Sequence, residues 1–246
     1  MAVENPVLYN GWWVYLRDTM GSTHLSPNDK QIHNAYKMRT ALQAQGYCDK
    51  AIAGVIGNAQ VESSLTTGAI QKPSVLPNGG ERLVDVPNSY MLQYYTPTAG
   101  GQGYGLGLLQ WDRFSQQYQG HDLLSWCNAN GYQWYDGNGQ MARLDFEFDH
   151  DSQYHFWDYQ YGPNLSWAVY KDIENSQYSH YDAAECAAVW DSCWERSSGT
   201  SRQARKDNAA FWYQYFIDHP TQPLQPWMVS LFQQKRKVLK NVKRTL

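Results

Sequence analysis

Apolar residues recur at steps of three and four positions in five separate stretches of this 246-residue chain. This spacing places the apolar side chains on one face of an α-helix, so each stretch predicts a helix that packs against others. We therefore expect a mainly α fold. The five stretches are 32–42, 52–59, 141–148, 183–194 and 209–217.

Turn and cap residues set the limits of the first two predicted helices. Asn28 is a suitable N-cap for the first helix, and Gly46 supplies its stop signal. Asp49 is expected to cap the second helix, which should run to about Ser64.

The remaining segments suggest the domain organisation. Residues 1–27 mix aromatic and turn residues without a sustained period, so we expect an N-terminal extension. Residues 66–103 contain several prolines and glycines, which predicts a long irregular or small-β loop over a substrate. Three prolines follow the last predicted helix and separate a domain at 28–219 from a linker and basic tail at 220–246.

Composition excludes several classes of protein. No apolar run approaches the roughly 18 residues of a membrane-spanning helix, and the N-terminus MAVENPVLYNGWW lacks the basic and apolar regions of a secretion signal. The whole chain carries a net charge of −3 and its last twelve residues carry +6, so the first 234 residues carry −9. An acidic body of this kind argues against specific nucleic-acid binding.

The four cysteines predict neither a metal site nor a local disulfide. They form no CxxC pair, no histidine has the spacing of a zinc ligand, and HExxH is absent. Cys186 and Cys193 lie seven residues apart on one predicted helix, about 10.5 Å of rise, which exceeds the roughly 6.8 Å that a disulfide tolerates. We expect no metal, no cofactor and four unpaired thiols, with one long-range bridge as the alternative.

Glu62 is the strongest candidate for chemistry. It follows Ala59 by three positions and Val55 by seven, so its carboxyl group should lie beside the buried stripe of the second helix. Partial burial and the negative end of the helix dipole both favour the protonated carboxyl group, which can act as a general acid. Asn58 and Ser63 share this helix and are candidate substrate-binding residues. The alternative is a solvent-exposed glutamate that merely ends a helix.

A glycine-rich segment about forty residues later offers a second part of a site. Alternating glycines, including Gly105 and Gly107, let a backbone approach a ligand closely. Tyr104, Gln110 and Trp111 add aromatic faces and an amide, which suit the flat faces of pyranose rings. A tight turn packed beneath Trp111 is the alternative interpretation of this segment.

These motifs, with two later ones, resemble the phage tail lysozymes and, more remotely, goose-type lysozymes and soluble lytic transglycosylases. The resemblance covers residues 28–217. Ser64 replaces the usual glycine after "ES", and Asp112 stands where threonine is common after "QW". The four motifs in chain order are Ala53–Asn58 with Val61–Leu65, Gly105–Trp111, Gln140 with Leu144, Phe146 and Glu147, and Asp182–Glu185 with Trp194–Arg196 and Arg205.

The resemblance implies a lysozyme-like helical domain that cleaves the MurNAc-GlcNAc bond of peptidoglycan, with Glu62 as proton donor. A second carboxylate about 5 to 5.5 Å away would give retention, and one about 6.5 to 9.5 Å away would give inversion. Asp85 and Asp112 are the candidates for that group. In lytic transglycosylases a hydroxyl group of the sugar attacks instead, so both reactions stay open.

The resemblance also implies a place of action. A wall enzyme without an export signal fits delivery by a phage tail during genome injection, with peptidoglycan strands as partner. We expect the basic tail to be either a flexible end or a docking peptide for other tail proteins, with a DNA or lipid contact as the remaining alternative. The alternative functions are an endolysin and a non-catalytic tail or knob protein that keeps the fold for glycan binding.

Overall fold

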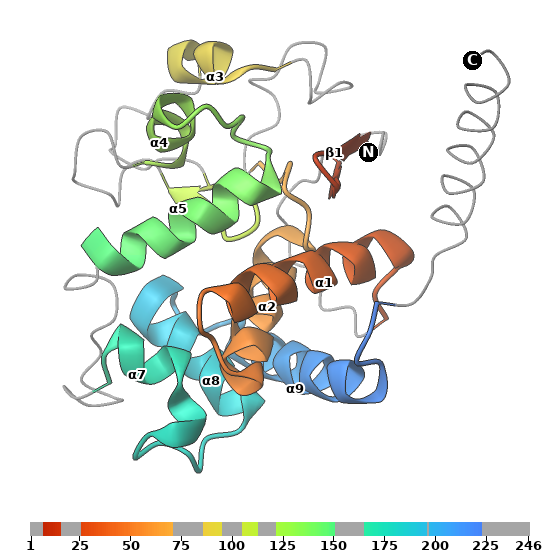
Figure 1. Ribbon diagram of the computed structural model, residues 1–246, viewed down its shortest axis with the longest axis vertical. Helices are drawn as coiled ribbons and strands as arrows, with labels where there is room; N and C mark the ends of the chain where they lie inside the picture. The colour runs from red at the N-terminus through yellow and green to blue at the C-terminus, as the bar shows by residue number, and fades with distance from the viewer. Residues whose placement is uncertain are drawn as a thin grey trace, which may run out of the picture.

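Helices dominate the part of the chain that the structure describes, as the apolar spacing predicts (Figure 1). The computed structural model describes residues 7–15, 26–70, 86–94, 105–112, 122–150, 165–195 and 197–222. Its helices are α1 (Asp29–Ala44), α2 (Asp49–Ser63), α3 (Asn88–Tyr94), α4 (Leu123–Ala129), α5 (Gly137–His150), α7 (Trp167–Lys171), η4 (Ile173–Asn175), α8 (Ala183–Trp190), the π-helical turn η5 (Asp191–Glu195) and α9 (Arg202–Asp218). Two antiparallel hairpins are formed by β1 (Val7–Tyr9) with β2 (Trp12–Val14) and by β3 (Gly105–Leu106) with β4 (Trp111–Asp112).

The predicted cap of α1 is confirmed, whereas the predicted cap of α2 is wrong by one residue. The Asn28 side chain accepts hydrogen bonds from the backbone of Lys30 and Gln31, and the Gln31 side chain accepts one from the backbone of Asn28. Asp49 is the first residue of α2, after Cys48 as its N-cap. The Cys48 amide donates to the Lys171 carbonyl at 2.7 Å, so a tertiary contact fixes this helix start.

Two glycines explain how closely α2 approaches its neighbours. α2 packs against α1, α8 and α9. A Cβ atom at Gly54 would lie 2.9 Å from the Cys186 backbone, and one at Gly57 would lie 2.7 Å from the backbone of Arg205 and of Ala209. Glycine at these positions therefore lets the backbones of α8 and α9 contact α2, and it brings Arg205 close to the α2 helix.

The expected N-terminal extension joins the domain core over residues 7–15, which corrects the prediction. Trp12 is 1% exposed and belongs to the main hydrophobic cluster. Its indole Nε1 donates to Asn138 Oδ1 at 2.9 Å, and its ring fills the space where Gly137 has no side chain. The aromatic residues near the N-terminus thus complete the packing of α5.

The proline-rich segment 66–103 is not wholly irregular. It contains α3, which packs against α4, and Ile70 forms an isolated bridge with Leu106 of β3. The short β3–β4 hairpin follows this segment and is not part of it, and residues 71–85 and 95–104 lie outside the described residues.

The cysteines are unpaired, which confirms that prediction. Cys127, Cys186 and Cys193 are buried, and Cys48 is partly exposed. Burial raises the pKa of the Cys127 thiol to about 12. Over the described ranges, no helix is both long and apolar enough to cross a membrane, and no group of three or more His, Cys, Asp and Glu side chains is arranged to hold a metal ion.

Candidate active site

Glu62 lies in the last turn of α2 with its side chain 21% exposed. The helix ends in an unusual turn, because Ser64 and Leu65 have φ values of 54° and 60°, in the left-handed region. The Ser64 carbonyl accepts hydrogen bonds from Tyr15 Oη at 2.9 Å and from Gln31 Nε2 at 3.2 Å. These contacts stabilise the left-handed turn although Ser64 is not a glycine. They therefore fix the position of the last turn of α2, which carries Glu62.

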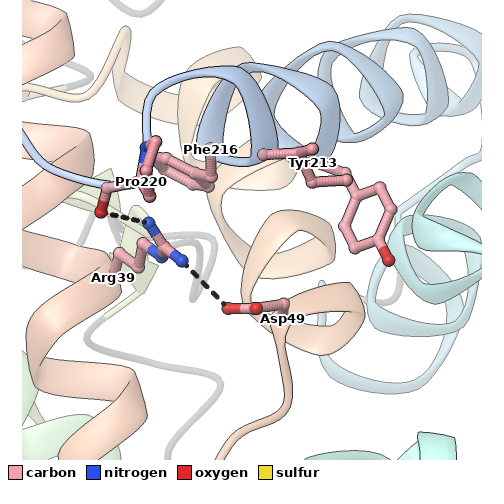
Figure 2. A pocket seen from close by; sticks show the side chains of 6 residues that line it. Arg39, Asp49, Tyr213, Phe216 and Pro220 are labelled. Carbon is pink, nitrogen blue, oxygen red and sulfur yellow. Dashed lines mark hydrogen bonds and ion pairs between the residues drawn. The ribbon is translucent and has the colours of Figure 1, made fainter.

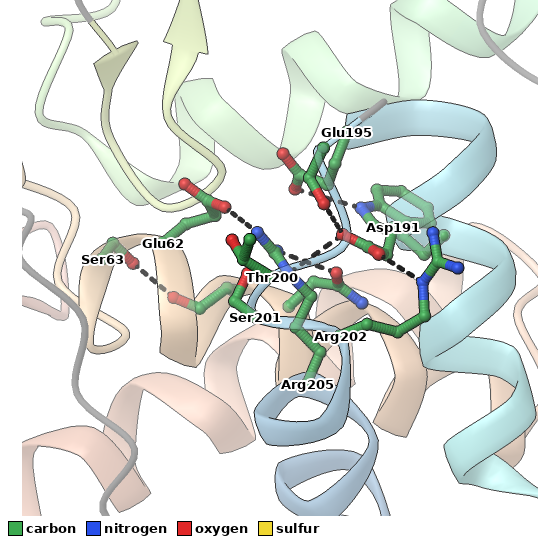
Figure 3. A network of polar contacts seen from close by, with 12 residues as sticks. Glu62, Ser63, Asp191, Glu195, Thr200, Ser201, Arg202 and Arg205 are labelled. Carbon is green, nitrogen blue, oxygen red and sulfur yellow. Dashed lines mark hydrogen bonds and ion pairs between the residues drawn. The ribbon is translucent and has the colours of Figure 1, made fainter.

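Arg205 of α9 connects Glu62 to the core (Figure 3). Its Nη2 forms an ion pair with Glu62 Oε1, its Nη1 donates to Asn58 Oδ1 at 2.9 Å, and its Nε lies 3.1 Å from Asp191 Oδ1. Burial alone would lower the pKa of Arg205, but the negative charges of Glu195 and Glu62 outweigh it and raise the pKa above its ordinary value. The guanidinium group is therefore a fixed positive charge beside Glu62.

Asp191 is fully buried, and three side chains form hydrogen bonds or ion pairs with its carboxylate. Its Oδ2 lies 2.8 Å from Arg202 Nε, and its Oδ1 accepts from Arg205 and from the Ser197 hydroxyl group. Arg202 also donates from Nη2 to Ser192 Oγ at 2.8 Å. Asp191 thus anchors both arginines of α9 in one orientation.

Glu195 is the second carboxyl group near Glu62, and the sequence reasoning did not single it out. It lies at the end of the π-helical turn η5 and accepts from Trp190 Nε1 at 3.4 Å. The residue retains some exposed surface, yet burial of its carboxyl group, followed by the negative charge of Glu62, raises its pKa well above the ordinary value. Arg205 acts in the opposite direction and is outweighed.

Asn58 and Ser63 lie behind Glu62. Asn58 is fully buried, its amide nitrogen donates to the carbonyls of Gly54 and Ala187, and its oxygen accepts from Arg205. Ser63 is also buried and donates to the Ala59 carbonyl at 2.8 Å. Both side chains are thus engaged inside the protein and do not line a surface, contrary to the expectation that they bind substrate.

The glycine-rich hairpin is packed from inside the protein, as in the alternative interpretation of that segment. A Cβ atom at Gly107 would lie 2.6 Å from the Gln140 side chain, and one at Gly105 would lie 2.6 Å from the Gln110 side chain. Gln140 is fully buried and donates to the carbonyls of Thr67 and Trp134 while it accepts from the Leu108 amide. These glycines make room for two glutamines and not for a ligand.

Trp111 corrects a second expectation, because its ring is only 3% exposed and cannot present a face to a sugar. Its Nε1 donates to Glu147 Oε2 at 3.4 Å, and Glu147 forms a buried ion pair with Arg143 at 3.0 Å. The Trp111 ring meets the edge of Trp194 at a centroid distance of 6.1 Å. The hairpin therefore supports η5, next to Glu195. Gln110 is partly exposed, with φ 50° and a 2.9 Å hydrogen bond to the Gly107 carbonyl.

The remaining candidates cannot be placed against Glu62. Asp85 and Tyr104 lie outside the described residues, and of Asp112 only the backbone, in β4, is described. Arg205 contacts Glu62, Asp191 and Asn58, and the negative charge of Glu195 acts on it as well. The sequence signal for Glu195 is its place four residues after Asp191, a spacing that puts two side chains on one helical face.

A separate pocket of about 230 Å³ lies at the start of α2 and not at Glu62 (Figure 2). Arg39 lies in this pocket, donates to the Pro220 carbonyl and forms a 3.5 Å ion pair with Asp49. Because Asp49 begins α2 and Glu62 lies near its end, about 20 Å of helix separates the two places.

A family model described as phage tail lysozyme matches residues 33–216. Morphogenesis protein 1 of Bacillus phage B103 is 24% identical over 192 residues, which is 78% of this chain and 41% of that protein. The chain thus spans less than half the length of this relative.

Proposed function

Because this chain belongs to the phage tail lysozyme family, we propose that it cleaves the glycosidic bond between MurNAc and GlcNAc in host peptidoglycan. Glu62 is the proton donor to the leaving oxygen in this proposal, and the protein acts from the phage tail during genome injection. Peptidoglycan glycan strands are its substrate.

The observation that carries the proposal is the position of Glu62. Its carboxyl group is partly exposed at a helix end, while a nearly fully buried arginine fixes it from behind. A carboxyl group that is held in one place and reachable by a substrate suits general acid catalysis, in which geometry comes before acidity. Asn58 and Asp191 orient Arg205, so we assign them a supporting role.

We keep Gln110 as a proposed substrate contact, because its side chain is partly exposed on the hairpin turn. Asp85 and Asp112 remain candidates for the second group, which either traps the sugar or activates water. A transglycosylase would need neither, since a hydroxyl group of the sugar attacks.

The proposal is tested with the full chain on isolated cell walls of several chemotypes. Glu62→Gln should lower the rate of turbidity loss by about 100-fold or more, the usual contribution of a general acid. Glu174→Gln makes the same chemical change at an exposed residue of η4 and should leave the rate unchanged. Equal lysis by Glu62→Gln and the parent would remove Glu62 from the mechanism.

Mass spectrometry of the digested muropeptides identifies the reaction. Hydrolysis leaves reducing sugar ends, and transglycosylation leaves an anhydro ring that is lighter by one water. Cleavage of the stem peptide would release amino groups and would contradict a glycosidase. Asp85→Asn and Asp112→Asn should each be compared with the parent, because only the true second carboxylate lowers the yield of the hydrolytic product.

A structural role is the second candidate, because the phage relative is named a morphogenesis protein. In that case the domain binds glycan or other tail proteins without cutting, and its basic residues after position 234 are candidates for docking. Absence of lysis by the parent on every wall type, together with retained wall binding, would favour this function.

A further inference from the structure

Among the residues that the structure describes, the cluster around Arg205 has more acids than bases. Three carboxyl groups, those of Glu62, Asp191 and Glu195, act on one another around the guanidinium groups of Arg202 and Arg205 (Figure 3). When all five groups are ionised, one negative charge is uncompensated. A single bound proton makes the cluster neutral, which is favourable where burial makes charge costly.

The contacts indicate which acid lacks a cation. Asp191 has both arginines within 3.1 Å, and Glu62 has the Nη2 group of Arg205. Within the described part of the chain, the hydrogen bond of Glu195 comes from the indole of Trp190, at 3.4 Å, and no ion pair reaches it. Glu195 is therefore the member of the cluster best suited to hold the proton.

Glu62 needs a source for the proton that a general acid donates, because its ion pair with Arg205 uses the carboxylate form. A general acid must carry a proton when the substrate is bound. Glu195 is close enough that Glu62 is the charge with the largest effect on it. In the described ranges, the charged groups that act on Glu195 are Glu62 from α2, Arg205 from α9 and Asp191 from η5 itself.

We propose that Glu195 is a positioning residue that shares one proton with Glu62, so that Glu62 is protonated when a glycan strand binds. The proton leaves the Glu195 carboxyl group and is taken up by the Glu62 carboxylate, and the fixed positive charge of Arg205 then compensates the Glu195 carboxylate in place of Glu62. The charge of the cluster stays the same in this step. The inference rests on the proposed function of Glu62 as proton donor.

The sharing has a consequence for the pH dependence of catalysis. Two carboxyl groups that share a proton titrate as a pair, and the basic limb of the activity profile reports the loss of that proton. In Glu195→Gln, two acids face two guanidinium groups and every charge is compensated. Arg205 then holds Glu62 as a carboxylate more firmly, so the basic limb should move to lower pH.

The experiment is the pH profile of wall lysis by the parent, Glu195→Gln and Glu195→Asp. A shift of the basic limb by about one pH unit corresponds to an activity loss of about tenfold on the basic side, with activity on the acidic side retained. Glu195→Asp keeps an acid and should restore much of the parental limb, while Glu174→Gln should match the parent throughout. A profile of Glu195→Gln that is lowered equally at all pH values, or that coincides with the parent, would overturn the proposal.

A second measurement keeps the proposal testable if Glu195→Gln does not fold. Carbon-13 NMR of the carboxyl groups in the parent chain should show one glutamate that titrates well above the ordinary range and is absent from the Glu195→Asp spectrum. Titration of all glutamates near 4.5 would contradict the inference. Lysis by Glu62→Gln would instead defeat the proposed function, whereas an inactive Glu62→Gln with an unshifted Glu195→Gln profile defeats only the sharing of the proton.

Discussion

Gly57 is the position where one added methyl group should disturb both packing and the site. In Gly57→Ala, the new Cβ atom would lie 2.7 Å from the Ala209 amide nitrogen and 2.7 Å from the Arg205 carbonyl oxygen. Ordinary contacts begin near 3.4 Å. Both neighbours are backbone atoms of α9 that cannot rotate away, so α2 and α9 must separate by a fraction of an ångström.

The cost of this separation follows from two opposing effects. Overpacking of a tight core costs about 1 to 3 kcal/mol, and the better helix propensity of alanine returns about 1 kcal/mol. With rigid neighbours the upper figure applies, which leaves a net loss of about 2 kcal/mol. For a domain of this size the loss corresponds to roughly 4 to 8 °C in Tm.

Thermal unfolding followed by circular dichroism, with lysis measured well below Tm, tests this reasoning. Because the Arg205 backbone moves, Gly57→Ala should also lose activity while it is still folded. Gly46→Ala is the comparison: it has open space but a φ of 86°, so it should cost about 1 kcal/mol through strain alone and leave the activity of the folded protein unchanged. A Tm of Gly57→Ala at or above that of the parent would refute the close packing of α2 on α9.

Three further outcomes are expected. Ser64→Gly should raise the free energy of unfolding in urea by roughly 0 to 1 kcal/mol. Glycine adopts φ 54° without strain, but it loses more chain entropy on folding, so the two effects partly cancel. A clear loss of stability would contradict the left-handed turn. The raised pKa of Glu195 contributes stability that is present below the ordinary value of 4.5 and is lost as pH rises through the raised value, so the Tm of Glu195→Gln should gain on that of the parent as pH rises above 4.5; a difference in Tm that is constant with pH would argue against it. Cys127, with a pKa of about 12, should react with a thiol reagent only after unfolding, and rapid labelling of the native chain would show that it is not buried.

Local patterns predicted much of the helical framework. The spacing of apolar residues located α1, α2, α5, α8 and α9, because burial of one face repeats with the helical period. The cap at Asn28 was also readable, since a capping box needs only residues three apart. The same reasoning placed Glu62 near the end of a buried helix.

Tertiary contacts account for what the sequence did not predict. The ion pair between Glu62 and Arg205 joins residues 143 positions apart, and no local spacing predicts it. Trp111 was expected to present its ring to a sugar, yet it is buried against Trp194. Trp12 was expected outside the domain, yet it is buried against Gly137. In both cases the partner lies in another element. The glycines of the hairpin were assigned to a ligand because the packing of Gln140 against them cannot be read from composition.

The π-helical turn η5 has a consequence for how the chain tolerates length changes. Such a turn is wider than an α-helical turn and commonly accommodates one additional residue within a helix. Deleting one residue of η5 would remove that additional residue, so the segment would close to ordinary α-helical turns and the residues after it would keep their register. The same deletion inside α8 would rotate the residues after it by about 100° about the axis, so it should do more harm there than in η5.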